Sequence, residues 1–256
     1  MEKNETKVAV VTGATRGLGR AIALELGQRG VSIVASGRDP EAGREVVEAI
    51  TAAGGEAIFV PTDLENPTDT DALALAAVER FGGIDIVVAS AGLHPAAQGF
   101  FGTFEVAEAG LQVSRTIQVK LNPVQSCLPH MTERGSGSIL FVTSEGGRFP
   151  TSGQTTVALH SGGLIHAARV LAKEFSRHRI RVNTLCVTIV EDTPTWERFS
   201  GGEMTEQRQK MFSKITAKAP FGIAHPEDVA NVAAFLVSDE SGFVTGATIS
   251  ATGGLG

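Results

Sequence analysis

Short apolar runs and longer segments with helical spacing alternate along most of the chain. The near-continuous apolar runs predict strands that are buried on both faces of a sheet. The predicted strands are Lys7–Thr12, Ser32–Ser36, Ala57–Val60, Ile84–Ala89, Ser138–Thr143, Arg181–Cys186 and Ala247–Ala251. Segments with apolar positions at helical spacing follow most of them. The predicted helices are Leu18–Gln28, Glu41–Ala53, Asp69–Phe81, Thr156–Ser176 and Pro226–Val237.

Repeated strand–helix units predict an α/β fold with one doubly wound parallel sheet and helices on both faces. The chain has 256 residues and contains no internal repeat or low-complexity linker, so we expect a single domain over 1–256. The stretch between residues 89 and 138 is predicted to be only partly helical. The polar segment 190–225, with Pro194, Trp196 and Phe212, breaks the alternation. It is either a substrate lid or a helical excursion on the surface.

Composition excludes several classes of function. The net charge of −6 leaves no basic footprint for nucleic acid. No apolar run is long enough to span a membrane, and the polar N-terminal residues MEKNETK do not predict a signal peptide. The two cysteines, Cys127 and Cys186, have no clustered partners, so we expect buried free thiols rather than a metal site. A cytoplasmic location follows as the expectation.

The segment Val8–Arg20, VAVVTGATRGLGR, carries the clearest chemical signal. An apolar strand runs into Thr12, glycines stand at positions 13, 17 and 19, and a helical pattern follows. Exposed backbone N–H groups and the positive end of the helix dipole make such a turn a site for a pyrophosphate. Gly13 permits the turn, Gly17 lets the backbone approach the phosphates, and Gly19 lets the helix pack close to the strand.

Further motifs follow this turn in a characteristic order. They are Asp63 after the third strand, ASAG at 89–92, LPHM at 128–131, ILFVTS ending at Ser144, RIRVN at 179–183, PEDVANVAAFLVSD at 226–239 and TGATISATGG at 245–254. With TGATRGLG at 12–19, the chain resembles the classical short-chain dehydrogenase/reductase family over nearly its whole length. The resemblance implies a seven-stranded Rossmann domain, a nicotinamide dinucleotide, a small-molecule substrate, and a homodimer or homotetramer.

The choice of cofactor is argued from charge. An acidic residue about 20 positions beyond the glycine turn binds the ribose of NAD and repels a 2′-phosphate. Here Arg38 stands at that point, Arg16 lies within the turn, and Asp39 is expected to point away. A guanidinium suits a phosphate, so we expect NADP(H); the alternative is that both arginines are solvated surface charges. The residues assigned to the cofactor are Gly13, Thr15, Arg16, Gly17, Leu18, Gly19, Arg38, Asp63, Leu64, Ser90, Ala91, Gly92 and Val190.

The catalytic half departs from the family pattern. The family uses a tyrosine as general acid or base, a lysine four residues later, a serine that polarises the substrate carbonyl, and an asparagine that holds a water. Ser144 stands at the serine position. By the family's spacing, Val157 takes the tyrosine position and Ser161 the lysine position, and the chain contains no tyrosine at all. Valine cannot transfer a proton and serine carries no charge.

Substitutes for the missing acid are sought nearby. His160 is adjacent to Ser161 on the predicted helix, and its pKa would suit an acid or base; a packing or surface histidine is the alternative. Glu145 directly follows the strand end and is expected to face the cleft, and His94 is a further candidate at its border.

Two other family positions are also altered. The asparagine position falls near Thr116, with Asn122 as a possible displaced substitute. The threonine that contacts the nicotinamide carboxamide in the family is Asp192, with Thr193 adjacent.

Three functions remain open from the sequence. The first is an NADP(H)-dependent oxidoreductase with a non-standard proton donor, acting on a small carbonyl, alcohol or enoyl substrate. The second is a redox-neutral dehydratase, isomerase or cyclase on the same scaffold. The third is a non-catalytic protein that binds NADP(H).

Overall fold

Seven parallel strands form one sheet in the order β3-β2-β1-β4-β5-β6-β7. The computed structural model describes residues 6–93, 99–200, 213 and 217–255. The strands are β1 (Val8–Thr12), β2 (Ser32–Gly37), β3 (Ala57–Pro61), β4 (Ile86–Ala89), β5 (Gly137–Ser144), β6 (Ile180–Val187) and β7 (Thr248–Ser250). The predicted doubly wound parallel sheet is therefore confirmed, and every predicted strand is present within a few residues of its expected bounds.

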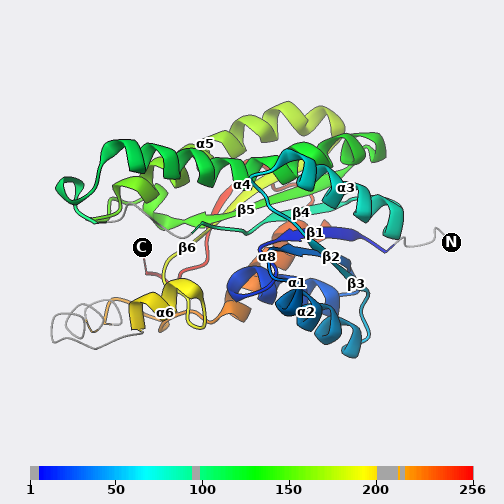
Figure 1. Ribbon diagram of the computed structural model, residues 1–256, viewed down its shortest axis with the longest axis horizontal. Helices are drawn as coiled ribbons and strands as arrows, with labels where there is room; N and C mark the ends of the chain where they lie inside the picture. The colour runs from blue at the N-terminus through cyan, green and yellow to red at the C-terminus, as the bar shows by residue number, and fades with distance from the viewer. Residues whose placement is uncertain (1–5, 94–98, 201–212, 214–216, 256) are drawn as a thin grey trace.

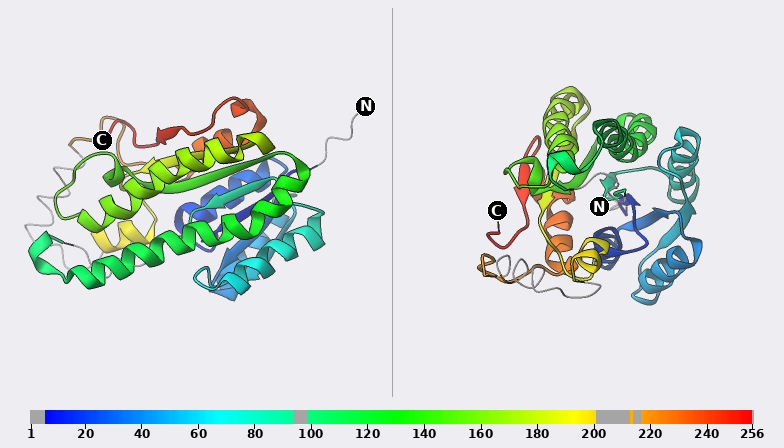
Figure 2. Two further views of the ribbon diagram at one scale, coloured as in Figure 1. Left: turned by 90° about the horizontal axis from the view of Figure 1, so that it is seen from above. Right: turned by 60° about the vertical axis from the view of Figure 1, so that its left-hand side comes forward.

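Helices cover both faces of the sheet (Figure 1). On one face lie α1 (Gly17–Gln28), α2 (Pro40–Ala52) and α8 (Pro226–Val237), and on the other lie α3 (Pro67–Phe81), α4 (Val106–Arg134) and α5 (Thr155–Phe175). The shorter helices are η1 (Phe101–Thr103), η2 (Glu145–Gly147), η3 (Ser176–His178), α6 (Pro194–Ser200) and η4 (Asp239–Ser241). Figure 2 shows α4 and α5 running alongside one another over the sheet.

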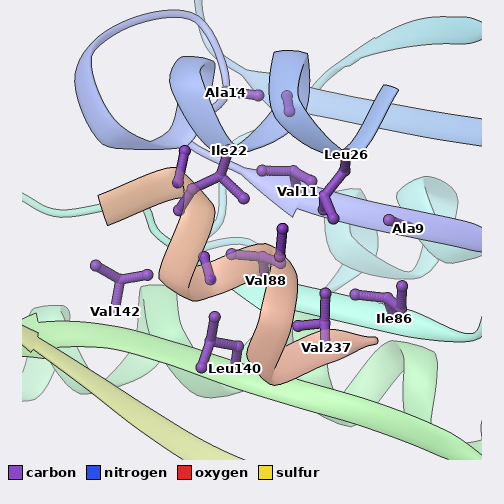
Figure 3. Close-up of a cluster of buried hydrophobic side chains, with 14 of the residues drawn as sticks. Ala9, Val11, Ala14, Ile22, Leu26, Ile86, Val88, Leu140, Val142 and Val237 are labelled. Carbon is purple, nitrogen blue, oxygen red and sulfur yellow. The ribbon is translucent and has the colours of Figure 1, made fainter. Parts of the chain in front are cut away.

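The core has two halves, one on each side of the sheet. Along β1, Ala9 and Val11 join the half beneath α1 and α8, whereas Val8 and Val10 join the half beneath α3, α4 and α5. Figure 3 shows the first half, in which side chains of α1 and α8 meet those of β1, β4 and β5. Because successive strand residues point to opposite faces and both faces are buried, the strands read as continuous apolar runs.

The largest difference between the sequence prediction and the structure is helix α4. It is one helix of 29 residues, although Pro123 and Pro129 lie inside it. An internal proline removes a helical hydrogen bond and costs about 3 kcal/mol in a helix. The buried stripe that runs along α4 offsets this cost, because it packs against β4, β5, α3 and α5. Pro123 leaves the carbonyl of Val119 without its usual helical donor, four residues earlier.

Strand register sets where a site can form. Thr12 at the end of β1 is level with Ser36 at the end of β2 and with Ala89 at the end of β4. The chain winds outward from β1 in one direction and from β4 in the other, so the order reverses between these two strands. In such sheets a crevice forms beyond the carboxyl ends at the point of reversal. The glycine turn therefore begins at the place where this fold binds ligands.

Candidate functional site

The glycines of the turn after β1 are required by its geometry. Gly13 has φ +67°, and a Cβ there would lie 2.7 Å from Cα of Ala91. A Cβ on Gly19 would overlap the carbonyl oxygen of Gly13, because α1 begins directly against the turn. Gly17 has φ +54° and starts α1, and its Cβ would lie 3.2 Å from Pro194. Gly13 and Gly19 thus hold backbone so close to backbone that a Cβ would clash, and Gly17 is favoured by its positive φ.

The turn forms one wall of a cavity of about 540 Å³ at the carboxyl edge of the sheet. All of the residues that the sequence analysis assigned to the cofactor line this cavity: Gly13, Thr15, Arg16, Gly17, Leu18, Gly19, Arg38, Asp63, Leu64, Ser90, Ala91, Gly92 and Val190. The remaining wall includes Val119 of α4, Thr193, and Pro194 and Thr195 of α6. The described lining residues thus come from the ends of five strands (β1, β2, β3, β4 and β6) and from four helices (α1, α2, α4 and α6).

Two arginines lie at this cavity without a fixed partner. Arg16 and Arg38 are exposed, and neither makes a hydrogen bond or ion pair with another described residue. The acids nearby are engaged elsewhere. Asp39, which the sequence analysis expects to point away, also lines the cavity. Its carboxylate caps α2 by accepting hydrogen bonds from the backbone N–H groups of residues 41 and 42. The guanidinium of Arg115 lies 2.5 Å from Glu65 and, with a smaller contribution from Arg38, lowers the pKa of that carboxyl. The positive charge of Arg38 therefore remains available to an anion.

Ser144 ends β5, and its hydroxyl accepts a hydrogen bond of 3.1 Å from the N–H of Gly146. A Cβ on Gly146 would lie 3.4 Å from the Ser144 oxygen and 3.1 Å from the side chain of Val157. Ser144 and the first turn of α5 are therefore neighbours across this glycine. The structure brings together the positions that the resemblance assigned to the serine and the tyrosine, but Val157 offers only methyl groups there.

His160 and Ser161 lie one turn further along α5. Ser161 is fully buried, and its hydroxyl lies 3.2 Å from Nδ1 of His160. Its small side chain fits the close approach of η2, since a Cβ on Gly147 would lie 2.7 Å from that of Ser161. Burial, and to a smaller extent the charge of Lys120, lower the pKa of His160 to about 4. His160 is therefore neutral at pH 7.

Glu145, which the sequence analysis expects to face the cleft, does not line this cavity. Its side chain is buried and accepts hydrogen bonds from Ser250 of β7 and, at 3.2 Å, from Arg148. Arg148 also donates to Ser250, which closes a small polar network between the end of β5 and β7. The physical reason is that β6 and β7 continue the sheet beyond β5, so the residue after Ser144 turns toward them. Glu145 therefore supports the sheet edge.

The hydroxyl and amide proposed for the asparagine role are also engaged with backbone. Thr116 donates to the carbonyl of Gln112 at 2.8 Å, and Asn122 donates to the carbonyl of Leu64 at 2.9 Å. Thr193 lines the cavity, donates to the carbonyl of Val190 at 2.7 Å and accepts from an N–H of α6. His94, Phe212 and the parts 201–212 and 214–216 of the expected lid lie outside the described residues.

Sequence reasoning missed Lys120, a buried ammonium group in this region. Its side chain is only 5% exposed, and Nζ donates to the carbonyls of Ala89 on β4 at 2.8 Å and Val142 on β5 at 2.7 Å. Burial lowers its pKa to about 7. A signal was present in the sequence, because Lys120 lies on the stripe of α4 that also carries Thr116, Val124 and other buried residues. A charge on a helix face that packs into a core marks an unusual position.

Two structural findings bear on other kinds of site. Among residues 6–93, 99–200, 213 and 217–255, no helix is long and apolar enough to cross a membrane. Within the same residues, no group of three or more His, Cys, Asp or Glu side chains is placed to hold a metal ion.

Comparisons with known proteins agree with this geometry. The family described as "Enoyl-(Acyl carrier protein) reductase" matches residues 13–256. An oxidoreductase of Methylorubrum extorquens, described as uncharacterized, is 37% identical over 266 residues, with all of both chains covered. The 3β-hydroxysteroid dehydrogenase 1 of Eggerthella lenta is 33% identical, with 97% of this chain and 93% of the relative covered.

A solved structure is also similar to this chain over almost its whole length. A 7α-hydroxysteroid dehydrogenase in complex with NADH and 7-oxo glycochenodeoxycholic acid superimposes with a TM-score of 0.87 at 27% identity. The alignment covers 97% of this chain and 93% of that enzyme. With a family match over almost its whole length and relatives above 30% identity, this chain belongs to the short-chain dehydrogenase/reductase family.

Proposed function

We propose that this protein is an NADP(H)-dependent oxidoreductase that acts on a small carbonyl, alcohol or enoyl substrate with a proton donor other than tyrosine. One observation carries the proposal: every residue assigned to the cofactor from the sequence lines a single cavity, and Arg16 and Arg38 lie there without ion pairs among the described residues. The relatives named as dehydrogenases support an oxidoreductase, and the bound NADH of one solved structure supports a nicotinamide cofactor.

The residues present fit such a cofactor. The turn after β1 needs glycine at positions 13 and 19, because a Cβ at either position would clash with neighbouring backbone. The first turn of α1 contains no acidic residue, and the residue before it, Arg16, makes no side-chain cap. The N–H groups of this helix end are therefore available to a pyrophosphate, and the helix dipole favours the anion. Arg38 and Arg16 would bind the 2′-phosphate that distinguishes NADP(H) from NAD(H).

The chemistry divides between the cofactor and the chain. When bound, the nicotinamide supplies or takes up a hydride. Ser144 is set to hold the substrate oxygen, because its own oxygen already accepts from Gly146 and its proton remains free to donate. Val157 and Ser161 stand where the family acid and its lysine are expected, and no tyrosine exists elsewhere in the chain. The proton must therefore come from another group.

Assembly and location complete the proposal. We propose a homodimer or homotetramer, which the family resemblance implies. Apolar side chains exposed on α4 and α5 support association, since Leu111 is 62% exposed and Leu159 is 58% exposed. Both cysteines are free and buried, which supports a reducing compartment such as the cytoplasm. Light scattering during size-exclusion chromatography tests the assembly, and a monomeric mass would contradict it.

Nucleotide binding provides the main test. Fluorescence titrations with NADPH and NADH are compared for the wild type, for Arg38→Ala, and for Arg44→Ala. Arg44 is an exposed arginine of α2 that does not line the cavity, so it is a matched control. We expect NADPH to bind more tightly than NADH, and Arg38→Ala to weaken NADPH binding by about 10-fold or more. Equal affinity for both nucleotides in every variant would refute the cofactor assignment.

Turnover is measured separately. Absorbance of NADPH is followed with a panel of ketones, aldehydes and enoyl thioesters, and of NADP⁺ with the matching alcohols. Ser144→Ala is expected to lower kcat without a large change in nucleotide affinity, because Ser144 does not line the nucleotide cavity. Tight NADPH binding with no change in NADPH absorbance on any substrate would favour a redox-neutral enzyme or a nucleotide-binding protein instead.

A further inference from the structure

The wall of the proposed nucleotide cavity carries more acids than bases. Two guanidiniums, those of Arg16 and Arg38, line it together with the carboxylates of Asp39, Asp63 and Glu65. Among the described residues, no other charged side chain lines this cavity. The lining taken by itself therefore has a net negative charge at pH 7, which disfavours the 2′-phosphate of NADP(H). A further positive charge beside this wall would favour that cofactor.

Arg115 of α4 supplies such a charge from outside the cavity lining. Its Nε lies 2.5 Å from one carboxylate oxygen of Glu65, and its Nη2 lies 2.7 Å from the other. A guanidinium that donates to both oxygens of a carboxylate fixes the orientation of that carboxylate. The charge of Asp63 also acts on Arg115. Arg115 therefore offsets the excess of acid and determines where the Glu65 carboxylate points.

Arg38 lies where it could replace Arg115 as the partner of Glu65. Strands β2 and β3 are neighbours, and at their ends the N–H of Thr62 donates to the carbonyl of Gly37 at 2.9 Å. Arg38 follows one of these residues directly, and Glu65 follows the other by three positions. Both side chains line the same cavity, and the charge of Arg38 acts on the Glu65 carboxyl. A Glu65 carboxylate released by Arg115 would therefore attract the guanidinium of Arg38.

The loop that carries Glu65 has other contacts that hold its backbone. The N–H of Glu65 donates to the carboxylate of Asp63 at 3.1 Å, and Asn122 donates to the carbonyl of Leu64 at 2.9 Å. Arg115 and Asn122 are separated by two helical turns, so both lie on the same face of α4. Replacement of Arg115 therefore leaves the loop attached to α4 through Asn122, and only the pairing of the Glu65 side chain is free to change.

We propose that Arg115 determines the preference for NADP(H) over NAD(H) by holding the Glu65 carboxylate away from Arg38. The inference rests on the proposed NADP(H)-dependent function. With Arg115 in place, the guanidinium of Arg38 is free for the 2′-phosphate. Without Arg115, Glu65 pairs with Arg38 and adds an unbalanced negative charge, which acts against a 2′-phosphate in the way that an acid does in NAD(H) sites. Arg115 is a positioning residue, because it acts through Glu65 from outside the cavity lining.

The ratio of two nucleotide affinities tests the proposal. The Kd values of NADPH and NADH are measured by fluorescence for the wild type, for Arg115→Ala and for the control Arg44→Ala. Arg44 is also an exposed arginine on a helix, and its partners Glu41 and Glu48 do not line the cavity. We expect Arg115→Ala to weaken NADPH binding by about 5-fold and NADH binding by less than about 2-fold, and Arg44→Ala to bind both as the wild type does. A local loss of structure would weaken both nucleotides together, so an unchanged ratio in Arg115→Ala would overturn the proposal.

A second substitution tests whether Arg115 acts through Glu65. When Glu65→Gln is added to Arg115→Ala, the amide has the shape of the carboxylate but no charge to pair with Arg38. NADPH affinity is therefore expected to return to within about 2-fold of the wild type. Arg115→Lys keeps a cation beside Glu65 and is expected to retain most of the preference. NADPH binding that stays weak in the double variant would overturn the role of Glu65.

Ionic strength gives an independent reading. The selective loss of NADPH affinity in Arg115→Ala is expected to shrink in high salt, because salt screens charges that are exposed to solvent. A selective loss that is the same at low and at high ionic strength would overturn the electrostatic explanation.

Failure of this inference and failure of the proposed function give different results. If the wild type prefers NADPH and Arg38→Ala removes that preference while Arg115→Ala keeps it, the cofactor assignment stands and the role of Arg115 is overturned. If the wild type binds NADPH and NADH equally, or binds neither, the proposed NADP(H)-dependent function is overturned and the inference fails with it.

Discussion

The buried Lys120 predicts a specific dependence of stability on pH. In the unfolded chain this lysine holds its proton up to a pKa of 10.5, whereas in the folded protein it releases the proton at about 7. Between these values the unfolded state binds more protons, so the free energy of unfolding rises with pH. The sign is therefore opposite to that of a lysine held in a salt bridge.

The size of the effect follows from the shift. One pKa unit corresponds to about 1.4 kcal/mol, so lowering the pKa from 10.5 to about 7 corresponds to roughly 5 kcal/mol in total. Part of this interval is usable in an experiment, because the raised pKa values of the two buried cysteines reduce stability again above about pH 9. Between about pH 7 and pH 9 the expected gain from Lys120 is roughly 2 kcal/mol.

Urea unfolding at closely spaced pH values measures this gain. The control variant is Lys173→Met, which replaces an exposed lysine of α5. The wild type and this control are expected to become more stable by roughly 2 kcal/mol relative to Lys120→Gln over this range. The comparison with Lys120→Gln cancels the contributions of groups whose pKa does not depend on Lys120, including the two cysteines. Parallel curves for the wild type and Lys120→Gln would refute the reasoning, since they would mean that Lys120 keeps an ordinary pKa in the folded protein.

Three further predictions concern the fold itself. Gly13→Ala is expected to lower the free energy of unfolding, measured by thermal melts, by about 2–4 kcal/mol, because it combines positive φ with a Cβ 2.7 Å from the backbone of Ala91. The control Gly30→Ala, at positive φ but in open space, should lower it by only about 1–2 kcal/mol. Asp85→Ala removes the acceptor 2.8 Å from the N–H of Val8 and should cost about 1–3 kcal/mol, whereas an unchanged melting temperature would contradict this. The two free thiols are buried and their pKa values are raised to about 12, so a thiol reagent at pH 8 should label them only after unfolding.

Local sequence patterns predict much of the architecture. Strands buried on both faces read as apolar runs, as at Val8–Thr12, and helix ends read as glycines. The glycine turn could be recognised because its conformation depends on neighbouring residues alone, and Gly13 indeed has positive φ. Helix α4 was not recognised as continuous, because Pro123 and Pro129 are local signals for a break. Tertiary packing of its buried face overrides those signals.

The sequence by itself determined the strand–turn–helix unit, the order of the elements and the absence of any tyrosine, since these depend on residue type and short-range spacing. Only the tertiary structure decided how side chains from separate elements meet. It turned Glu145 toward Ser250 on β7, and it placed Lys120 of α4 against the ends of β4 and β5. Both outcomes depend on strands that are distant in sequence and adjacent in the sheet. The physical reason is that burial and its effect on a charge are set by neighbours in space, which no local pattern along the chain specifies.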